Sequence, residues 1–386
     1  MSRRKVCIVI GSRANYSSIK SAMRAIERHP ALELQLVVGA SALLDRYGAV
    51  VSLIERDGFR PAAKVHMLIE GETPETMAKS TGLGLLELPT LFGQLRPDVV
   101  LTVGDRFETM ATTLAAAYMN LPIAHTMGGE VSGTIDESIR HAVTKFAQLH
   151  FPASKAARER IIRLGERPED VHLVGCPRMD LVAEILAQGQ APRLDEHLFD
   201  VGVGERFDLS QPFLLVSQHP VTTEYGHGER QVTETLKAVR EVGLPAIVLW
   251  PNADAGSDDV ARGIRKWRER KLDRDMHFFK NLPVETYIRL MKRTACVVGN
   301  SSSGIREGAF IGTPVVDIGT RQEMRERGRN VIEAPHEAAA IAGAIRRQVE
   351  HGPYATDPIY GDGHAGERIA AILAECEFRI QKRITY

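Results

Sequence analysis

Short apolar runs alternate with longer amphipathic stretches along most of the chain, and this rhythm limits the possible folds more than any other feature. Examples are KVCIVI (5–10), DVVLTVG (98–104) and PFLLVSQ (212–218). The runs are short and flanked by Gly or Pro, which favours strands over buried helical segments. Strands that are apolar on both faces and separated by helices are typical of a doubly wound parallel sheet. The sequence therefore predicts an α/β fold.

The rhythm breaks once, between residues 176 and 212, where the chain is polar, rich in Gly and Pro and weakly periodic. We interpret this stretch as a linker with one helix between two similar α/β halves. We expect a first domain over residues 1–178, completed by a C-terminal helix over residues 367–386, and a second domain over residues 179–366. Ligands of open parallel sheets bind beyond the carboxyl ends of the strands, so two facing domains would form a cleft there.

The charge balance argues against several classes of partner. Lysine plus arginine equals aspartate plus glutamate at 49 each, so no long-range field attracts nucleic acid or an anionic membrane. The four cysteines form no CxxC pair, and the pattern is that of thiols in a reducing cytoplasm. The N-terminal apolar run is interpreted as a first strand and not as a signal peptide. No 18-residue apolar stretch occurs, so we expect a cytoplasmic protein.

Two polar motifs follow strands of the first half. Gly11 and Arg13 come just before a helix start, where an arginine beside backbone N–H groups forms an anion site. An ordinary strand–helix turn with a solvated arginine explains this motif as well. Asp105 and Arg106 follow another strand, and Asp105 is either a helix N-cap or a catalytic group. Neither a dinucleotide fingerprint nor a Walker loop is present.

The stretch HTMGGEVSGTIDESIRH (125–141) gathers carboxylates, an arginine and two histidines beside a pair of glycines. Thr134 and Glu137 have the spacing of a capping box, and Asp136 suits a first helical turn. These structural roles leave Glu130 unexplained. Because the two glycines before it allow the backbone to approach a ligand closely, we expect Glu130 either to point into the cleft or to brace the loop.

The second half repeats the pattern of polar residues directly after strands. In GNSSSGIREGAF (299–310), serines and backbone N–H groups at a helix start form a phosphate cradle, and Glu307 is placed to accept from ribose hydroxyls. Polar residues follow four apolar runs of this half, in QHPVTTE, PNADAGS, GNSSSGIREGAF and IGTRQ, which is more than chance would place there. The candidate binding residues of this half are His219, Asn252, Asp254, Ser301, Ser302, Glu307 and Arg321.

The chain resembles the hydrolysing UDP-N-acetylglucosamine 2-epimerases in the motifs GSRANYSS, GDRFET, GGEVSGTIDESIRHA, QHPVTTE, PNADAGS, GNSSSGIRE, GTPVVDIGTRQ and IYGDG. These motifs run from residue 11 to residue 363 and cover essentially the whole chain. The resemblance implies a GT-B architecture, with two Rossmann-like domains facing across a cleft and a last helix that crosses back to the first domain. It also implies a UDP-sugar substrate, no metal or redox cofactor, and a homo-oligomer, either a dimer or a tetramer.

Enzymes of that family remove the C2 proton of the sugar, expel UDP to leave a 2-acetamidoglucal, and add water with inversion at C2. The resemblance implies acid–base roles for Asp105 and Asp136, with Glu130 and His219 as further catalytic candidates. It assigns contacts with UDP or the sugar to Arg13, Arg106, His219, Asn252, Asp254, Ser301, Ser302, Glu307 and Arg321. We expect His219 to donate to a phosphate and not to bind zinc, because no second ligand lies at metal-site spacing.

Met127 departs from the family pattern. Many relatives carry a carboxylate three residues before the equivalent of Glu130, as a third acid–base group, and methionine cannot transfer a proton. Either Glu130 or Asp136 replaces it, or the reaction is a hydrolysis without inversion at C2. A third interpretation is a different substrate, a UDP-linked 2,4-diacetamido-trideoxyhexose as in legionaminate-type pathways, whose 6-methyl group Met127 would contact.

Two functions outside this reaction also fit parts of the sequence. A glycosyltransferase of the same fold would need an acceptor groove, which the sequence does not exclude. A non-catalytic regulator that binds UDP-sugars would lack ionisable groups in the cleft, whereas this chain keeps several.

A regulatory site is a separate hypothesis. Arg262 and Arg265 lie three apart on an expected helix, where some family members bind the end product CMP-sialic acid. A solvated basic face explains the two arginines as well.

Overall fold

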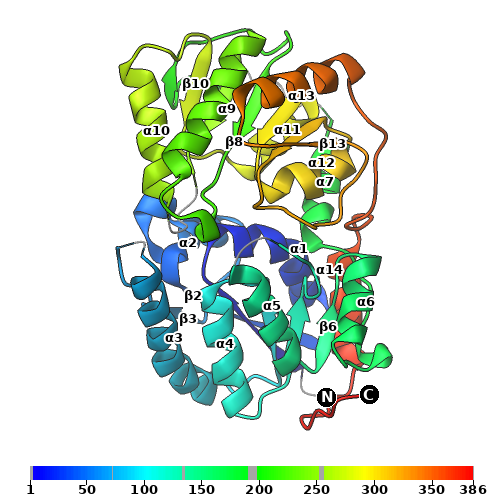
Figure 1. The fold of residues 1–386 in the computed structure, drawn as a ribbon. Helices are drawn as coiled ribbons and strands as arrows, with labels where there is room; N and C mark the ends of the chain where they lie inside the picture. The colour runs from blue at the N-terminus through cyan, green and yellow to red at the C-terminus, as the bar shows by residue number, and fades with distance from the viewer. Residues whose placement is uncertain (1–2, 72, 133–134, 190–197, 252–255, 386) are drawn as a thin grey trace. The chain divides into compact units, whose positions relative to one another are not determined.

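A computed structural model describes residues 3–71, 73–132, 135–189, 198–251 and 256–385. Its contacts divide the chain into two compact units, Met1–Glu130 with Ile135–Leu181 and Tyr360–Tyr386, and Val131–Thr134 with Val182–Ile359. Each unit contains one β-sheet with helices packed against it (Figure 1). The predicted domain boundaries at residues 178 and 366 stay a prediction, because contacts within a fold do not test which parts of the chain fold independently.

The first unit is built on a six-stranded parallel sheet in the order β3-β2-β1-β4-β5-β6. Its strands are β1 (Arg4–Ile10), β2 (Leu32–Gly39), β3 (Ala63–Val65), β4 (Val99–Val103), β5 (Ile123–Thr126) and β6 (Leu149–Phe151). This is the strand order of Rossmann domains. The order reverses between β1 and β4, so the loops after these two strands flank the point where such sheets bind ligands.

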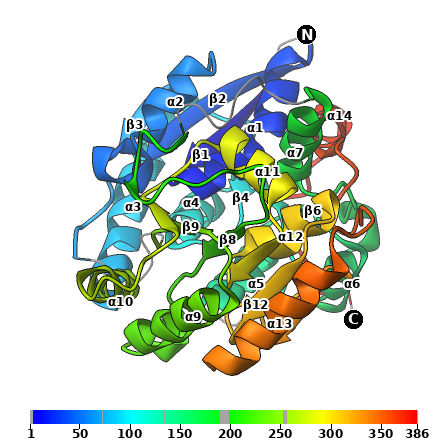
Figure 2. The same ribbon diagram turned by 90° about the horizontal axis from the view of Figure 1, so that it is seen from above.

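The helices of the first unit are α1 (Arg13–Arg28), α2 (Val50–Arg56), α3 (Pro74–Leu95), α4 (Phe107–Tyr118), α5 (Ile135–Phe146), α6 (Lys155–Arg163) and α14 (Ala365–Glu375), while α7 (Pro177–Ala187) runs from this unit into the next. Side chains along β1 point alternately to the two faces of the sheet. Cys7 and Val9 lie on the same face and join one apolar cluster with residues of α3 and α4. On another side of the unit, α1 packs against α14 (Figures 1 and 2).

The second unit contains a seven-stranded sheet in the order β13-β12-β11-β8-β9-β10-β7. Its strands are β7 (Val203–Gly204), β8 (Leu214–Ser217), β9 (Ala246–Leu249), β10 (Met276–Phe279), β11 (Cys296–Gly299), β12 (Val315–Ile318) and β13 (Val331–Ala334). Its helices are α9 (Gly228–Val242), α10 (Ser257–Glu269), α11 (Val284–Arg293), α12 (Ser302–Ile311) and α13 (Ala338–His351). Helix α9 packs against both α10 and α13 (Figure 1). The run PFLLVSQ, which was predicted as a strand, contains β8 at the centre of this second Rossmann-like sheet.

Two predictions of local structure need correction. The stretch 176–212 contains, besides a helix, the short strand β7, which pairs antiparallel with β10. The C-terminal helix predicted over residues 367–386 ends at Glu375. Arg4 Nη1 donates to the Leu373 carbonyl at 2.5 Å, which satisfies one of the last carbonyls of the helix, and its guanidinium lies over the ring of Phe378 beyond the helix end.

Candidate active site

The carboxylate of Asp105 is held by the guanidinium of Arg140. Asp105 follows β4, and Arg140 lies on α5 with its Nε 3.0 Å from Asp105 Oδ2, while its Nη2 contacts the same oxygen. The Arg140 side chain is 1% exposed and that of Asp105 is 23% exposed. This charge-assisted pair fixes the direction of a carboxylate that still reaches the surface of the first unit.

The same arginine fixes the loop that carries Glu130. Arg140 Nη1 donates to the Glu130 carbonyl oxygen at 2.7 Å, and Arg160 Nη1 donates to the Gly129 carbonyl oxygen at 2.9 Å. Gly129 has a φ of 74°, and a Cβ there would collide with a backbone carbonyl of α6, so the loop requires glycine. One buried guanidinium therefore contacts the side chain of Asp105 and the backbone of Glu130, two of the predicted catalytic residues.

His125 contacts the backbone of the residue before Asp105. Its Nε2 lies 3.0 Å from the Gly104 carbonyl oxygen, and its Nδ1 lies 3.3 Å from Thr144 Oγ1. Burial lowers the pKa of His125 to about 3, so the ring is neutral near neutral pH and its Nε2–H donates to Gly104. The sequence analysis gave His125 no role, although its place at the end of a strand was a usable signal.

Glu108 is a buried carboxylate that the sequence analysis missed. It lies in the first turn of α4 with 2% exposure, and its Oε1 accepts from Arg106 Nε at 3.0 Å. Its Oε2 has no hydrogen-bond partner among the described residues. A Cβ at Gly11 would overlap the Glu108 side chain, so this glycine leaves the space that Glu108 fills. Glu108 thus connects the loops after β1 and β4, where the strand order reverses.

The other predicted residues of the first unit lie at helix starts. Arg13 is the first residue of α1, and the N-cap Ser12 accepts from the Asn15 N–H at 3.2 Å. Asp136 lies in the first turn of α5. Glu137 pairs with His141 at 3.4 Å, while Thr134, its expected capping partner, lies outside the described residues. The predicted phosphate contact of Arg13 and the predicted acid–base role of Asp136 stay predictions.

Met127 is a packed side chain with 5% exposure. Its backbone has a φ of 59°, and its N–H donates to the Phe151 carbonyl at 3.0 Å. The Cys176 thiol points at its sulfur over 3.6 Å. Both side chains are apolar in character, so this contact fills buried space and Met127 supplies no proton-transfer group.

In the second unit, His219 and Asn300 bind each other across neighbouring strand ends. The His219 N–H donates to Asn300 Oδ1 at 2.7 Å, and Asn300 Nδ2 returns a bond to the His219 carbonyl at 2.9 Å. His219 Nε2 lies 3.3 Å from Ser217 Oγ. This pairing fixes the loop after β8 against the loop after β11, and it orients the imidazole at the carboxyl edge of the sheet.

The serine turn after β11 begins α12 as expected. Ser301 is the N-cap, its Oγ accepts from the Ser303 N–H at 3.4 Å, and Ser302 is the first helical residue. Tyr287 on α11 contacts Ser303 Oγ at 2.6 Å and so braces the turn. Glu307 is buried on the same helix. The N-terminus of α12 is therefore a well-ordered start of the kind that binds phosphate oxygens.

Arg321 joins this group from the loop after β12. Its Nη1 donates to the Asn300 carbonyl at 3.2 Å, and Gln322 Nε2 donates to the same oxygen at 3.0 Å. Asp317 lies buried on β12, where burial raises its pKa to about 6 although Arg327 and Arg321 oppose the shift. The structure thus brings His219, Ser301 and Arg321 together around Asn300, a residue that the sequence analysis did not single out.

Four predicted residues contribute less. Asn252 and Asp254 lie outside the described residues. Arg262 and Arg265 lie on the exposed side of α10, and Arg262 pairs with Asp259 at 3.0 Å, so an effector site there stays a prediction. In the described part of the chain, no cluster of three His, Cys, Asp or Glu side chains is arranged to hold a metal ion. None of its helices combines the length and the apolar character needed to cross a membrane.

Comparison with known proteins places these features in one family. The family model described as UDP-N-acetylglucosamine 2-epimerase matches residues 24–374. The chain is 32% identical to a UDP-N,N'-diacetylbacillosamine 2-epimerase (hydrolyzing) of Legionella pneumophila, over 96% of this chain and 95% of the relative. It is 30% identical to a UDP-N-acetylglucosamine 2-epimerase of Neisseria meningitidis, again over 96% and 95%.

Solved structures confirm the predicted GT-B fold class. The Neisseria meningitidis UDP-GlcNAc 2-epimerase bound to UDP-GlcNAc matches with a TM-score of 0.82 at 16% identity, over 96% of this chain and 100% of that one. The Methanocaldococcus jannaschii enzyme in complex with UDP-GlcNAc and UDP matches with a TM-score of 0.81 at 17% identity, over 96% and 99%. On the family match and the relatives of near-complete coverage, the chain belongs to the UDP-N-acetylglucosamine 2-epimerase family.

Proposed function

We propose that the protein is a hydrolysing 2-epimerase that converts a UDP-linked 2-acetamido sugar and water into UDP and the free 2-epimeric sugar. The observation that supports this most directly is the buried Arg140, which holds the Asp105 carboxylate and the backbone of the loop that carries Glu130. The Legionella relative is named as a hydrolysing enzyme and matches almost the whole chain. UDP-N-acetylglucosamine and a UDP-2,4-diacetamido-trideoxyhexose are the two substrates that we consider.

The first half of the reaction is an elimination. A carboxylate takes the C2 proton, the electron pair of that C–H bond forms the C1–C2 double bond, and the bond between C1 and the phosphate oxygen breaks. We assign this proton transfer and its reverse to Asp105 and Asp136. The guanidinium of Arg140 holds Asp105 in one direction, so the carboxylate meets the substrate without first having to be oriented.

The second half is a hydration. Water adds its oxygen to C1, and a proton returns to C2 on the face opposite to the one that lost it. Inversion therefore needs acid–base groups on two faces of the sugar. The attacking water also loses a proton, and since Met127 cannot accept it, we assign this transfer to Glu130, whose loop is fixed by Arg140 and Arg160.

UDP departure needs donors and positive charge at the phosphates. We assign these contacts to His219, the amides at the start of α12, and Arg321, which lie around Asn300 in the second unit. Glu307 is assigned to the ribose hydroxyls. Because UDP is a stable leaving group, its departing oxygen needs no proton from an acid, so these residues act by charge and by hydrogen-bond donation.

Reaction in deuterated water followed by proton NMR tests the proposal. The enzyme is incubated in parallel with UDP-N-acetylglucosamine and with UDP-N,N'-diacetylbacillosamine. We expect free UDP and a free 2-epimeric sugar that carries deuterium at C2. The better of the two substrates then identifies the groups at C4 and C6.

Other reactions of the same substrate would give different products. A non-hydrolysing epimerase would yield the 2-epimeric UDP-sugar without free UDP. A simple sugar-nucleotide hydrolase would release sugar with its C2 configuration and its C2 proton intact. A glycosyltransferase would consume substrate only after an acceptor is added. Each of these three results would contradict the proposed reaction.

A further inference from the structure

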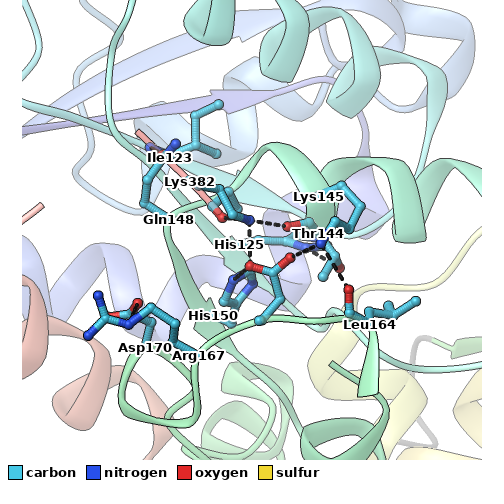
Figure 3. Close-up of polar contacts among 12 residues, drawn as sticks. Ile123, His125, Thr144, Lys145, Gln148, His150, Leu164, Arg167, Asp170 and Lys382 are labelled. Carbon is cyan, nitrogen blue, oxygen red and sulfur yellow. Dashed lines mark hydrogen bonds and ion pairs between the residues drawn. The ribbon is translucent and has the colours of Figure 1, made fainter. Parts of the chain in front are cut away.

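The segment after α14 carries a half-buried lysine, Lys382, that contacts a buried carboxylate. Residues 376–385 form neither helix nor strand and bend at Ile380 and Gln381, and the Lys382 side chain reaches Glu166 (Figure 3). Lys382 Nζ lies 2.5 Å from Glu166 Oε2, and it donates to the carbonyl oxygens of Ala147 at 2.5 Å and Thr144 at 3.1 Å. One ammonium therefore joins a carboxylate to the end of α5.

Glu166 anchors this lysine together with two further groups. Lys145 Nζ lies 2.6 Å from Glu166 Oε1, and His150 Nε2 lies 3.2 Å from Glu166 Oε2 (Figure 3). Burial alone would raise the pKa of Glu166, but its hydrogen bonds with His150, Lys145 and Lys382 lower it to about 2. Burial lowers the pKa of His150. Glu166 is thus a buried anion that is matched by two lysines.

Lys382 donates to backbone carbonyl groups at the carboxyl end of α5. The last carbonyl groups of a helix lack partners within the helix, and a cation there satisfies them and interacts favourably with the helix dipole. The buried side chains of α5 are Arg140, Val143 and Thr144. Because so little apolar surface holds this helix, the polar contacts at its carboxyl end carry a larger share of its attachment.

Two routes of contact lead from this end of α5 to Asp105. Arg140, one turn before Thr144, holds the Asp105 carboxylate directly. Thr144 Oγ1 lies 3.3 Å from His125 Nδ1, and His125 Nε2 donates to the carbonyl of Gly104, the residue before Asp105. A shift of the end of α5 would therefore disturb both the side chain and the backbone of Asp105.

We propose that Lys382 is a positioning residue for Asp105, which acts by capping α5 and holding Arg140 and His125 in place. Its expected effect on turnover rests on the proposed function, whereas its effect on α5 does not. Neither the acid–base candidates nor the UDP contacts include a residue beyond α14, so this assigns a role to a segment outside the reaction motifs.

The test compares three variants of the full chain. Lys382→Met keeps the aliphatic stem and removes the charge, Lys382→Arg keeps the charge, and Arg383→Met removes an exposed cation from the same segment. We expect Lys382→Met to lower kcat about tenfold while KM for the UDP-sugar stays within about twofold, since a misplaced reacting group affects the chemical step. Lys382→Arg should recover most of the loss, and Arg383→Met should match the unmodified enzyme.

Two further measurements separate positioning from simple stabilisation. Hydrogen–deuterium exchange of the ligand-free protein should be faster in residues 135–146 of Lys382→Met and unchanged in Arg383→Met. The acidic limb of the kcat–pH profile should move to higher pH, because a displaced Arg140 stabilises the Asp105 carboxylate less, while His125 stays neutral beside it. A contact that only stabilises the fold would lower the melting temperature and leave this limb in place.

The outcomes are distinct. Equal kcat, pH profile and exchange in Lys382→Met and the unmodified enzyme would overturn the proposal, as would an equal loss in Arg383→Met. If the unmodified enzyme converts no UDP-sugar, the proposed function fails, and the exchange rates alone then decide whether Lys382 holds α5. Faster exchange confined to residues 376–385 would also overturn the proposal.

Discussion

Replacing Asp105 by asparagine probes both the ion pair and the proposed chemistry with one change of side chain. The substitution keeps the shape and removes the charge. Arg140, at 1% exposure, then loses its carboxylate partner and retains its bond to the Glu130 carbonyl. Both guanidinium contacts end on one oxygen, Asp105 Oδ2, so an amide oxygen in that place can still accept them, but the negative charge that balances the guanidinium is lost.

The expected size follows from burial. Removing one partner of a fully buried ion pair costs about 3–5 kcal/mol. Asp105 is 23% exposed and an amide oxygen can keep the hydrogen bonds, so we expect a loss of about 2 kcal/mol in the free energy of unfolding. For a unit of this size, that corresponds to a fall of about 4–8 °C in melting temperature. If Asp105 transfers a proton, kcat should fall by about 10² to 10⁴.

Thermal unfolding and the NMR assay for UDP release measure the two effects. Asp57→Asn is the matched control, because Asp57 pairs with Lys20 at 2.7 Å and the two side chains are 19% and 7% exposed. The control should lose similar stability and keep its kcat. Full turnover by Asp105→Asn would refute the catalytic assignment, and an unchanged melting temperature would refute the structural one.

Three more predictions follow from single contacts. Gly129→Ala should lower the melting temperature and kcat together, because a Cβ at a φ of 74° collides with a backbone carbonyl; an unaltered melting curve would contradict the loop geometry. Arg321→Ala should weaken UDP binding in calorimetry by about tenfold or more, since a charge-assisted contact contributes about 1.5–3 kcal/mol, and equal affinity would remove it from the UDP site. The depressed pKa of Glu166, about 2, means that its contribution is complete above its unfolded value near 4.5 and is lost as pH falls toward 2. Glu166→Gln should therefore flatten the loss of stability over that range in acid titrations, and an unchanged slope would show that the carboxylate is not held as described.

The strands of the two sheets could be predicted because each is marked by a short apolar run within its own residues. A run such as KVCIVI is apolar on both faces, and its burial follows from that pattern alone. Asp105 and Glu130 were found because they follow strand ends and glycines. Lys382 could not be found, since a lysine in a presumed helix carries no sign of a carboxylate, Glu166, that lies far away in the sequence. Glu108 was missed because an acid in a first helical turn has an ordinary explanation in the helix dipole.

Met127 shows why a position within a motif has to be judged with its neighbours. By resemblance to the family motif, Met127 stands where many relatives carry a carboxylate. In the structure it is one half of a sulfur contact with Cys176, which lies 49 residues away, and its methyl group approaches the space beside Gly104. A carboxylate placed there would stand buried against a thiol, so the two residues have to be considered as a pair. We therefore keep Asp105, Glu130 and Asp136 as the proposed acid–base groups. Glu108, whose Oε1 accepts from Arg106, is a further carboxylate close to the carboxyl edge of the same sheet.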